Sequence, residues 1–597
     1  MKKILVLVTL LLSGGALLFF SCQQKKASAE KVIAQTLVNQ VRSFQNACDS
    51  LRNLLDKYTN EKWLQESFLQ ARVAFKRFEW AAEYFEPAPT RFVNGPPVPE
   101  VEETGQAFEP AGLQVIESLL FPHFDASKAS LVRSQIDIIK SKCKIYQSHF
   151  EKVEIFDWQI FDAVKLEVFR IETIGMAGFD NPLILKSSEE SSAALKCLQD
   201  VIGNYSTNNN YSLAVKFNNA LSFLSSNADF ETFDRAEFIL KYCNALTIGI
   251  SDLQRDLKLV PLKYNRLLNQ DAKTLFDTNA FNVNAYSPDM SSFATTQKIA
   301  LGKKLFYDPM LSGNGKRSCA SCHQPGRAFT DGLVKNIQFG SGGKLARNTP
   351  TLINAALQAG QFYDLRVNSL ENQAHDVVQN ALEMYGSIIA SAQTLWKDSI
   401  YKMLFLTAFP KGDRTSIDTS EVMNAIGSYV RSLTFLNSRF DQYMRGDREA
   451  ITTDERNGFN LFMGKAKCAT CHYPPLFNGT FPPRYMKTEV EVIGVPESIS
   501  ENRLDPDSGR YNIIKSPSLL HAFKIPTVRN VSLTGPYMHN GVFTTLEQVI
   551  DFYDKGGGSG LGLDVENQTL PADKLNLSAK EKGELIGFLK SLDDGFR

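Results

Sequence analysis

Two short segments combine cysteine and histidine at the spacing that attaches haem. Cys319-Ala320-Ser321-Cys322-His323 and Cys468-Ala469-Thr470-Cys471-His472 are both Cys-x-x-Cys-His motifs. Thiols at this spacing lie one helical turn apart and can add to the two vinyl groups of a porphyrin, and the histidine then supplies a nitrogen to iron. Cys-x-x-Cys alone also serves zinc and redox sites, but two motifs that both carry the histidine favour haem. We expect two covalently bound c-type haems, with His323 and His472 as proximal iron ligands.

Each motif lies inside an internal repeat. Leu301–Phe306 precedes the first motif and Asn457–Phe462 precedes the second, and the two units close on Tyr429–Leu433 and Phe588–Leu592. An apolar helix, the motif, loops and a closing helix are typical of one small cytochrome c domain. The repeat therefore predicts two such domains in tandem, joined near residues 445–453.

The region before the repeat is predicted to be a helical bundle. Phe75, Phe78, Ala82 and Phe85 share one face of the segment Arg72–Phe85, the period of an amphipathic helix. Loops are predicted at residues 87–99 and 205–211, with helical patterning again at 112–120. The fold class is therefore mainly α: an N-terminal helical bundle followed by two tandem cytochrome c-like haem domains.

The N-terminus carries the features of an export signal. Lys2 and Lys3 precede an apolar run from Ile4 to Phe20 that ends at Ser21-Cys22. A cysteine directly after a small residue resembles a bacterial lipoprotein cleavage site, and the alternative is an uncleaved membrane anchor. We expect a periplasmic protein held to a membrane by lipid on Cys22. The expected organisation is a signal peptide at 1–21, a helical domain at 22–268, and cytochrome c domains at 269–447 and 448–597.

Composition argues against nucleic acid as a partner, and the cysteines outside the haem motifs leave disulfide bonds open. The 65 Lys and Arg residues balance 65 Asp and Glu residues, so there is no electrostatic case for nucleic acid. Four cysteines remain after Cys22 and the haem motifs are set aside: Cys48, Cys143, Cys197 and Cys243. In an oxidising compartment they could form two disulfides with three possible pairings, or they could be buried thiols.

The N-terminal region resembles the imelysin-like helical domains, which carry a Gly-x-His-x-x-Glu motif. Gly112, Gln114 and Glu117 occupy the motif positions, so glutamine replaces histidine. The substitution argues against a metal site and favours a structural or docking role.

From Leu301 to the C-terminus the chain resembles the bacterial di-haem cytochrome c peroxidase family, which includes the MauG proteins. The matching segments are Leu301-Gly302 through Asp308-Pro309 with Leu311-Ser312, Phe329-Thr330-Asp331-Gly332, Arg347-Asn348-x-Pro350, Gln373 with Glu383-Met384, Lys524-x-Pro526-Thr527-x-Arg529-Asn530, and Pro536-Tyr537-x-His539-x-Gly541. The resemblance implies that the first haem is the peroxide site and the second the electron-transfer site.

The family's distal pair corresponds to Gln373 and Glu383. Cleaving the O–O bond of peroxide requires a proton to move from the inner to the outer oxygen, which a carboxylate above the iron can do as base and then acid. An amide can orient the bound oxygens. The alternative is that both residues are ordinary polar groups on a helix.

The first haem is expected to be open. Many family members block it with a histidine from the loop between the motif and Arg347, but residues 324–374 contain no histidine. We therefore expect a five-coordinate iron that is competent in the diferric state.

The second haem is expected to carry an unusual ligand. The position fourteen residues after His539, which is Met in cytochrome-fed peroxidases and Tyr in MauG, is Tyr553 here. A tyrosine oxygen favours ferric and higher states of iron. The alternatives are a plain core aromatic, or Met538 as the ligand. The family's bridging Trp corresponds to Tyr363, a candidate electron relay that must lose its proton when oxidised.

The resemblance also implies sites for a cation and for the haem propionates. The family's calcium site maps to Asn348, Thr534 and Pro536, whose oxygens suit a hard cation. Arg347 and Arg529 are plausible partners for haem propionates.

The leading functional interpretation is a peroxidase that reduces hydrogen peroxide to water with electrons from a small redox protein, a cytochrome c or a cupredoxin. The first alternative is a MauG-like enzyme that oxidises Trp or Tyr residues of a partner protein. The absence of Trp at residues 464–467 argues against it, and Tyr553 favours it. The alternative from another class is a di-haem electron-transfer cytochrome without peroxide chemistry. A homodimer is possible by analogy with the family.

Overall fold

The computed structural model describes residues 28–595, apart from residues 58–59, 206–209, 411, 413 and 502. The predicted signal peptide and Cys22 lie outside the described residues, as does most of the predicted loop at 205–211. Among the residues that the structure describes, no helix combines the length and the apolar character needed to cross a membrane.

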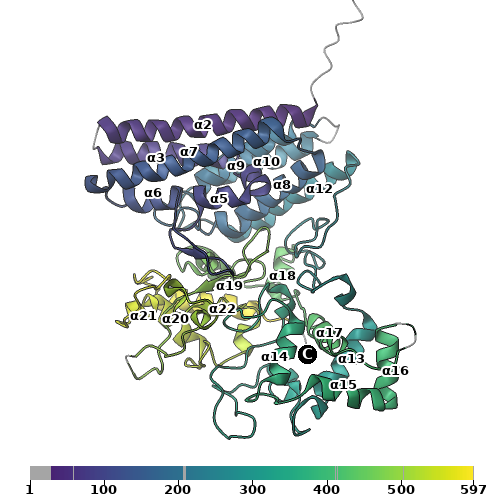
Figure 1. The fold of residues 1–597 in the computed structure, drawn as a ribbon. Helices are drawn as coiled ribbons and strands as arrows, with labels where there is room; N and C mark the ends of the chain where they lie inside the picture. Colours follow the sequence, from purple (N-terminus) through teal and green to yellow (C-terminus); the bar gives the residue numbers. More distant parts are fainter. Residues whose placement is uncertain are drawn as a thin grey trace, which may run out of the picture.

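The N-terminal part is a bundle of helices that lie side by side (Figure 1). Two short π-helical segments, Ile171–Gly175 and Phe238–Cys243, continue α8 and α11. Between α5 and α6 the chain forms a hairpin of two short antiparallel strands, β1 and β2. The bounds are α2 Ala29–Lys57, α3 Glu61–Lys76, α4 Glu79–Phe85, α5 Pro87–Asn94, β1 Glu100–Val101, β2 Ala107–Phe108, α6 Leu113–Leu120, α7 Ala129–Lys152, α8 Asp157–Arg170, α9 Ser187–Ile202, α10 Asn210–Ser226, α11 Arg235–Glu237 and α12 Asn244–Asp256.

Two local predictions in the bundle are wrong. Residues 87–94, predicted as part of a loop, form helix α5, which begins at Pro87. Proline is tolerated in the first helical turn because its missing N–H would have no partner there. The predicted helix Arg72–Phe85 is interrupted between Lys76 and Glu79, where α3 ends and α4 begins.

The charged side of that segment is buried rather than solvated. Lys76 Nζ donates to Glu79 at 2.8 Å and to Asp180 at 2.6 Å, and Arg72 pairs with Glu190. Each of these side chains is buried. Buried charges need such partners, so the α3–α4 segment has a paired polar core beside its apolar face.

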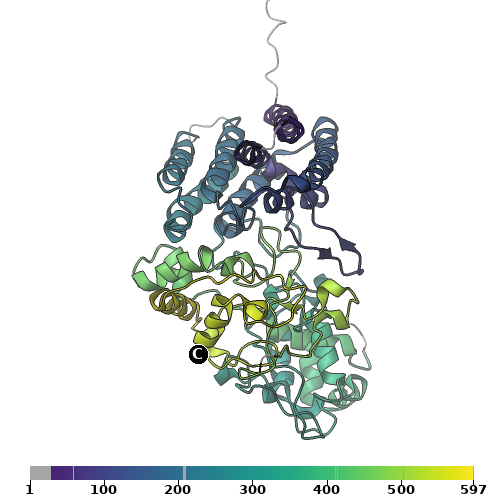
Figure 2. The same cartoon turned by 90° about the vertical axis from the view of Figure 1, so that its left-hand side faces the viewer.

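The two haem units lie beneath the bundle, and Figure 2 shows the second unit directly below it. Short helices alternate with long loops, and the strands are confined to one antiparallel pair, β3 with β4. The bounds are α13 Thr296–Tyr307, α14 Leu370–Gln379, α15 Ile388–Lys397, α16 Ser399–Ala408, α17 Thr419–Arg431, α18 Arg439–Met444, α19 Thr453–Met463, β3 Val490–Glu491, β4 Phe523–Lys524, α20 Leu546–Asp554, α21 Gly557–Gly560 and α22 Ala579–Ser591.

The internal repeat is visible as two equivalent helix crossings, α13 on α17 and α19 on α22. A Cβ added at Gly302 would lie 1.8 Å from the Ala425 carbonyl oxygen, and one at Gly458 would lie 2.0 Å from that of Glu584. Only glycine permits backbones to approach this closely. The glycine shared by Leu301–Phe306 and Asn457–Phe462 therefore sets the crossing in each unit.

One hydrophobic core runs from the bundle into the second haem unit. Phe44 and Ile160 of the bundle belong to the same cluster of buried side chains as Phe459, Phe477 and Phe588. Buried residues from the stretches 267–281 and 440–444 join this cluster as well. The first haem unit has two separate clusters, one around Leu305 and Phe405 and one around Phe306 and Phe329. Core packing thus unites the bundle with the second unit.

Candidate active site

The first motif forms a single 3-10 turn that points its histidine into the interior. The His323 backbone N–H donates to the Cys319 carbonyl at 2.9 Å, and Nδ1 donates to the Phe329 carbonyl at 3.0 Å. Burial lowers the pKa of His323. A neutral imidazole that donates from Nδ1 keeps Nε2 available for iron.

The second motif repeats this arrangement. The His472 N–H donates to the Cys468 carbonyl at 2.9 Å, and Nδ1 donates to the Pro526 carbonyl at 3.0 Å. Burial lowers the pKa of His472 to about 4. Both imidazoles are therefore neutral at physiological pH and oriented alike.

A cavity of about 1200 Å³ opens beside the first motif. Cys319, Cys322 and His323 form part of its wall, and most of the exposed wall area is apolar. The apolar wall side chains include Phe306, Leu352, Leu370, Val377, Val378, Ile426 and Val430. Two thiols, an oriented imidazole and an apolar wall together fit a covalently bound haem.

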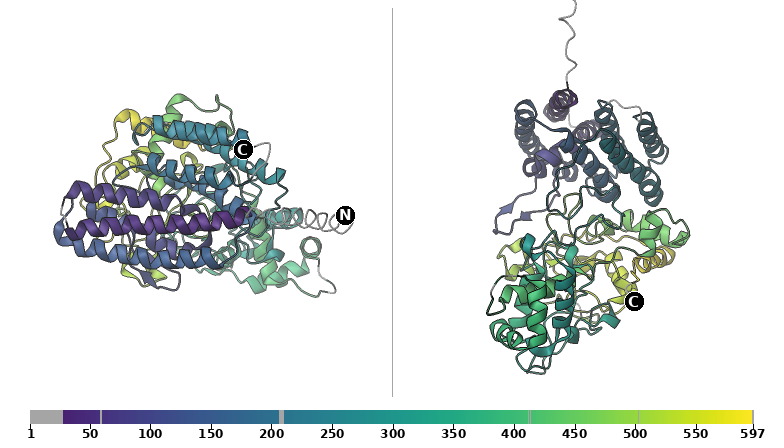
Figure 3. Two further views of the ribbon diagram at one scale, coloured as in Figure 1. Left: turned by 90° about the horizontal axis from the view of Figure 1, so that it is seen from above. Right: turned by 90° about the vertical axis from the view of Figure 1, so that its right-hand side faces the viewer.

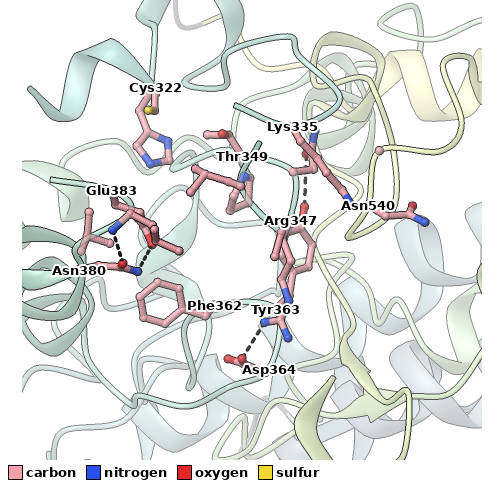
Figure 4. A pocket seen from close by; sticks show the side chains of 18 of the residues that line it. Cys322, Lys335, Arg347, Thr349, Phe362, Tyr363, Asp364, Asn380, Glu383 and Asn540 are labelled. Carbon is pink, nitrogen blue, oxygen red and sulfur yellow. Dashed lines mark hydrogen bonds and ion pairs between the residues drawn. The ribbon is translucent and has the colours of Figure 1, made fainter. Parts of the chain in front are cut away.

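Gln373 and Glu383 line the same cavity as His323. Gln373 lies on α14, and Glu383 follows that helix in a turn, so the two are not neighbours on one helix face. Asn380 Nδ2 donates to Glu383 Oε1 at 2.7 Å, as Figure 4 shows. Burial raises the pKa of Glu383, and the charge of Arg366 and the Asn380 hydrogen bond oppose this shift.

None of the other three histidines of the haem half lines the cavity. His375 is exposed, and His521 Nδ1 donates to the Asp507 carbonyl at 2.8 Å. His539 is buried, lies 3.1 Å from Asp505 and stacks on Phe523 with ring centroids 3.7 Å apart. Among the described residues no other histidine lines the cavity with His323, and the open first haem stays a prediction.

Tyr363 and Arg347 lie together on the side of the cavity away from Glu383 (Figure 4), and Asn348 also lines the cavity. The Tyr363 hydroxyl donates to Asn348 Oδ1 at 3.4 Å, and burial raises the pKa of Tyr363. The Tyr363 carbonyl accepts from Lys524 N at 2.7 Å. Tyr363 therefore joins the first unit to strand β4 of the second.

The predicted propionate partners already have carboxylate partners. Arg347 pairs with Asp364 at 2.6 Å and with Asp507 at 2.7 Å. Arg529 is buried and donates to both carboxylate oxygens of Asp441, at 2.7 and 2.8 Å. Their role toward the propionates stays a prediction.

The predicted calcium ligands come from two segments that meet. Asn348 N donates to the His539 carbonyl at 2.7 Å, which ties Asn348 to the loop that contains Thr534 and Pro536. Asn348 Nδ2 donates to the Leu333 carbonyl at 2.8 Å, so its Oδ1 faces away from that carbonyl. The described residues contain no cluster of three acidic, His or Cys side chains suited to a metal, and the calcium assignment stays a prediction.

Tyr553, on α20, lies within the electrostatic reach of the second motif. Burial raises its pKa, and so do the charges of Cys471, Cys468 and Glu491. Glu491 Oε1 is 3.8 Å from Cys471 Sγ, and burial raises the pKa of Glu491 to about 7. Iron ligation by Tyr553 stays a prediction.

The helical bundle covers the second motif but not the first. Ala469 is 0% exposed, whereas the equivalent Ala320 is half-buried and Ser321 is exposed. The π-helical segment Ile171–Gly175 contacts the 3-10 turn of the second motif. Phe179 of the bundle lies 6.2 Å from Tyr473 and 5.5 Å from Phe481 between ring centroids.

Hydrogen bonds also join the bundle to the helix that precedes the second motif. Ala236 N donates to Asn460 Oδ1 at 3.0 Å, and Asn460 Nδ2 donates to Asp234 at the same distance. The buried Arg235 guanidinium lies against Gly464, at the position where a Cβ would meet it at 2.8 Å. The bundle therefore packs against the stretch that leads into the second motif, in which Lys467 stays exposed.

The imelysin-like positions are part of the bundle's internal bonding. Gln114 Nε2 donates to the Asn94 carbonyl at 3.0 Å. Glu117 Oε1 accepts from the backbone N–H groups of Leu183 and Ile184, and burial raises its pKa to about 7. Gly112 has φ +96° and packs against Val93, where a side chain would clash. This geometry is consistent with a structural role.

Sequence reasoning missed three residues that shape the site. Asn380 holds Glu383, Glu491 approaches the second motif, and Arg317 donates to the Glu383 carbonyl at 2.8 Å. The Asn-x-x-Glu spacing at 380–383 could have indicated the first contact. Glu491 and Arg317 come from distant segments, and no local pattern marks them.

Comparisons with known proteins found similar sequences and a similar solved structure. The family model described as di-haem cytochrome c peroxidase matches residues 296–449. Cytochrome-c peroxidase IdrP1 of Pseudomonas sp. (strain SCT) is 33% identical over 358 residues, covering 55% of this chain and 91% of the relative. Methylamine utilization protein MauG of Methylorubrum extorquens is 35% identical over 298 residues, covering 50% and 78%. A crystal structure of a MauG-like protein associated with microbial copper homeostasis is 30% identical, with a TM-score of 0.47, covering 51% and 92%.

Proposed function

The chain belongs to the di-haem cytochrome c peroxidase family, and from that premise we propose that it reduces hydrogen peroxide to water with electrons from a small redox protein. One observation carries the proposal: a single cavity brings His323, Gln373 and Glu383 together. The donor would be a cytochrome c or a cupredoxin. Two electrons and two protons convert one peroxide into two waters.

The chain's own residues would manage the protons. Bound haem supplies an iron that accepts peroxide and exchanges electrons. The Gln373 amide orients the peroxide, and the Glu383 carboxylate takes the proton of the inner oxygen and returns it to the outer one. A raised pKa suits this task, because the group must both accept and release a proton near the working pH.

The second haem would receive electrons and pass them toward the first. The position of Tyr363 between the units supports its role as the relay, and Asn348 with Thr534 and Pro536 would hold calcium beside it. Tyr553 would supply an oxygen ligand to the haem that Cys468, Cys471 and His472 would hold. Its proximity to Cys468 and Cys471 supports this assignment.

A MauG-like oxidation of a partner protein is the second candidate, and Tyr553 is the observation that favours it. The bundle argues against direct contact of a partner with the second motif, because Arg235 lies against Gly464 and Ala469 is fully covered. A non-catalytic electron-transfer cytochrome, the alternative from another class, would need two blocked haems.

We further propose that the protein works in the periplasm, anchored by lipid on Cys22, with the bundle as a structural domain. The apolar N-terminal run supports export, and the shared core supports a structural role. A homodimer is proposed on the family resemblance alone.

The test is stopped-flow absorbance of the purified diferric protein after one equivalent of hydrogen peroxide, without prior reduction. A rapid change in the haem spectrum is the result expected from the proposed open first site. A near-infrared band would favour the MauG-like branch. No spectral change with either the diferric or the one-electron-reduced protein would leave the electron-transfer cytochrome as the remaining interpretation.

A further inference from the structure

Helices α2 and α7 run antiparallel and side by side in the bundle (Figures 1 and 3). A row of polar contacts fixes their register. Along this row the residue numbers rise on α2 and fall on α7, as antiparallel helices require. Cys48 of α2 and Cys143 of α7 lie between two of these contacts. The contacts are Arg42 with Glu151 at 3.2 Å, Gln45 with Gln147 at 2.8 Å, Asp49 with Lys140, Arg52 with Asp137, and Asp56 with Arg133 at 2.8 Å.

This register places the two thiols opposite each other. Gln45 and Asp49 bracket Cys48, and their partners Gln147 and Lys140 bracket Cys143. Both cysteines face inward: Cys48 is 1% and Cys143 0% exposed, in the same core cluster.

The electrostatics of the two thiols show the same proximity. Burial raises the pKa of Cys48, and the neighbouring Cys143 raises it further, because ionising one thiol disfavours ionising the other. Burial raises the pKa of Cys143 to about 12. Asp49 and Lys140 act on both thiols, so the two groups share one environment.

The remaining two cysteines of the bundle have other neighbours. Cys197 Sγ accepts a hydrogen bond from Gln40 Nε2 at 3.2 Å. Cys243 is fully buried in the second π-helical segment, where its pKa responds to Glu172 and to no other cysteine. Of the three possible disulfide pairings, the geometry favours only the bond between Cys48 and Cys143.

We propose that Cys48 and Cys143 form a disulfide bond that links α2 to α7. Formation of this bond is an oxidation of the two thiols. The two thiols lose two protons and two electrons in forming the S–S bond, and a disulfide-bonded donor protein of the export compartment is reduced to two thiols. The proposal rests on export of the chain and is independent of its peroxide chemistry.

The first test is a peptide map of the full-length protein, purified from the periplasm without reductant. Free thiols are alkylated in denaturant, and the digest is analysed by mass spectrometry. The expected result is a linked peptide pair that contains Cys48 and Cys143, with Cys197 and Cys243 alkylated. Alkylation of all four residues, or a different linked pair, overturns the proposal.

The second test is thermal unfolding of the Cys48→Ser and Cys143→Ser variants. The bond closes a loop of about 95 residues, so its loss should lower Tm by about 10 °C. Cys197→Ser is the matched control, since it also replaces a buried thiol by a hydroxyl. Reductant should lower the Tm of the natural protein and of the Cys197→Ser variant toward that of Cys48→Ser. An equal Tm for all three variants, with no effect of reductant, contradicts the proposal.

Discussion

Proton transfer in the cavity depends on one carboxyl group, Glu383. Its replacement in Glu383→Gln keeps the shape and removes the base, so kcat/KM for peroxide should fall about 10²- to 10⁴-fold. Steady-state assays with a reduced cytochrome c measure the effect. Asp376→Asn is the control for loss of a nearby carboxylate, because Asp376 lies on α14 but does not line the cavity. The charge of Asp376 raises the pKa of Glu383, so both variants are compared at a pH above that pKa. Equal activity of both variants would remove Glu383 from the mechanism.

The same carboxyl predicts a pH dependence. Glu383 acts as a base only when ionised, and burial raises its pKa above the ordinary glutamate value of about 4.3. Activity should therefore fall as pH drops through this raised pKa, at a higher pH than an exposed glutamate would give. The measurement is a pH profile of kcat/KM.

The variant Asn380→Ala tests whether Glu383 sets this pH profile. The Asn380 hydrogen bond stabilises the ionised carboxylate and so lowers its pKa. Without this bond the acidic limb of the profile should move to higher pH, while the plateau changes less than in Glu383→Gln. A limb that stays in place would mean that another group controls the profile.

Gly302 and Gly458 lie where the helices of each haem unit cross. Gly458→Ala would push a Cβ into the Glu584 carbonyl and should destabilise the second unit by about 1–3 kcal/mol. Gly302→Ala should do the same to the first unit through Ala425. Thermal unfolding followed by haem absorbance measures both changes.

Gly583→Ala is the control for these variants. Gly583 lies on α22 with no atom within 4 Å of an added Cβ, so alanine should stabilise its helix by about 0.5–1 kcal/mol. If Gly458→Ala were as stable as Gly583→Ala, the crossing would tolerate a side chain.

The whole molecule is expected to unfold in two steps rather than three. The bundle and the second haem unit share one core, whereas the first unit has its own clusters. Phe440→Ala removes a side chain from the shared core and should destabilise the protein by about 3–5 kcal/mol. The unfolding temperatures of the bundle and the second unit should fall together. Calorimetry with far-ultraviolet circular dichroism measures this.

Phe405→Ala is the matched variant in the first unit. The Phe405 side chain is equally buried but belongs to a separate cluster. The variant should therefore lower the unfolding temperature of the first haem unit alone. Separate unfolding of the bundle and the second unit in Phe440→Ala would show that the shared core does not couple them.

The sequence by itself determined the chemistry that is local in the chain. Haem attachment needs two thiols and an imidazole within five residues, so Cys319–His323 and Cys468–His472 were identifiable without a structure. The repeat around Gly302 and Gly458 was visible for a similar reason, because each glycine lies in a short apolar helix pattern.

The tertiary structure decided what depends on residues far apart in the chain. The family resemblance indicated Gln373 and Glu383, but only the fold brings them to the cavity of His323 and adds Asn380 and Arg317. Likewise, the period of Arg72–Phe85 indicated a helix but not the buried partners of its charges. A residue's surroundings are set by packing between distant segments, and hydrophobic periodicity reports only which side of one segment is apolar. For that reason the cover that the bundle forms over Ala469, and the core it shares with the second haem unit, could be found only in the folded chain.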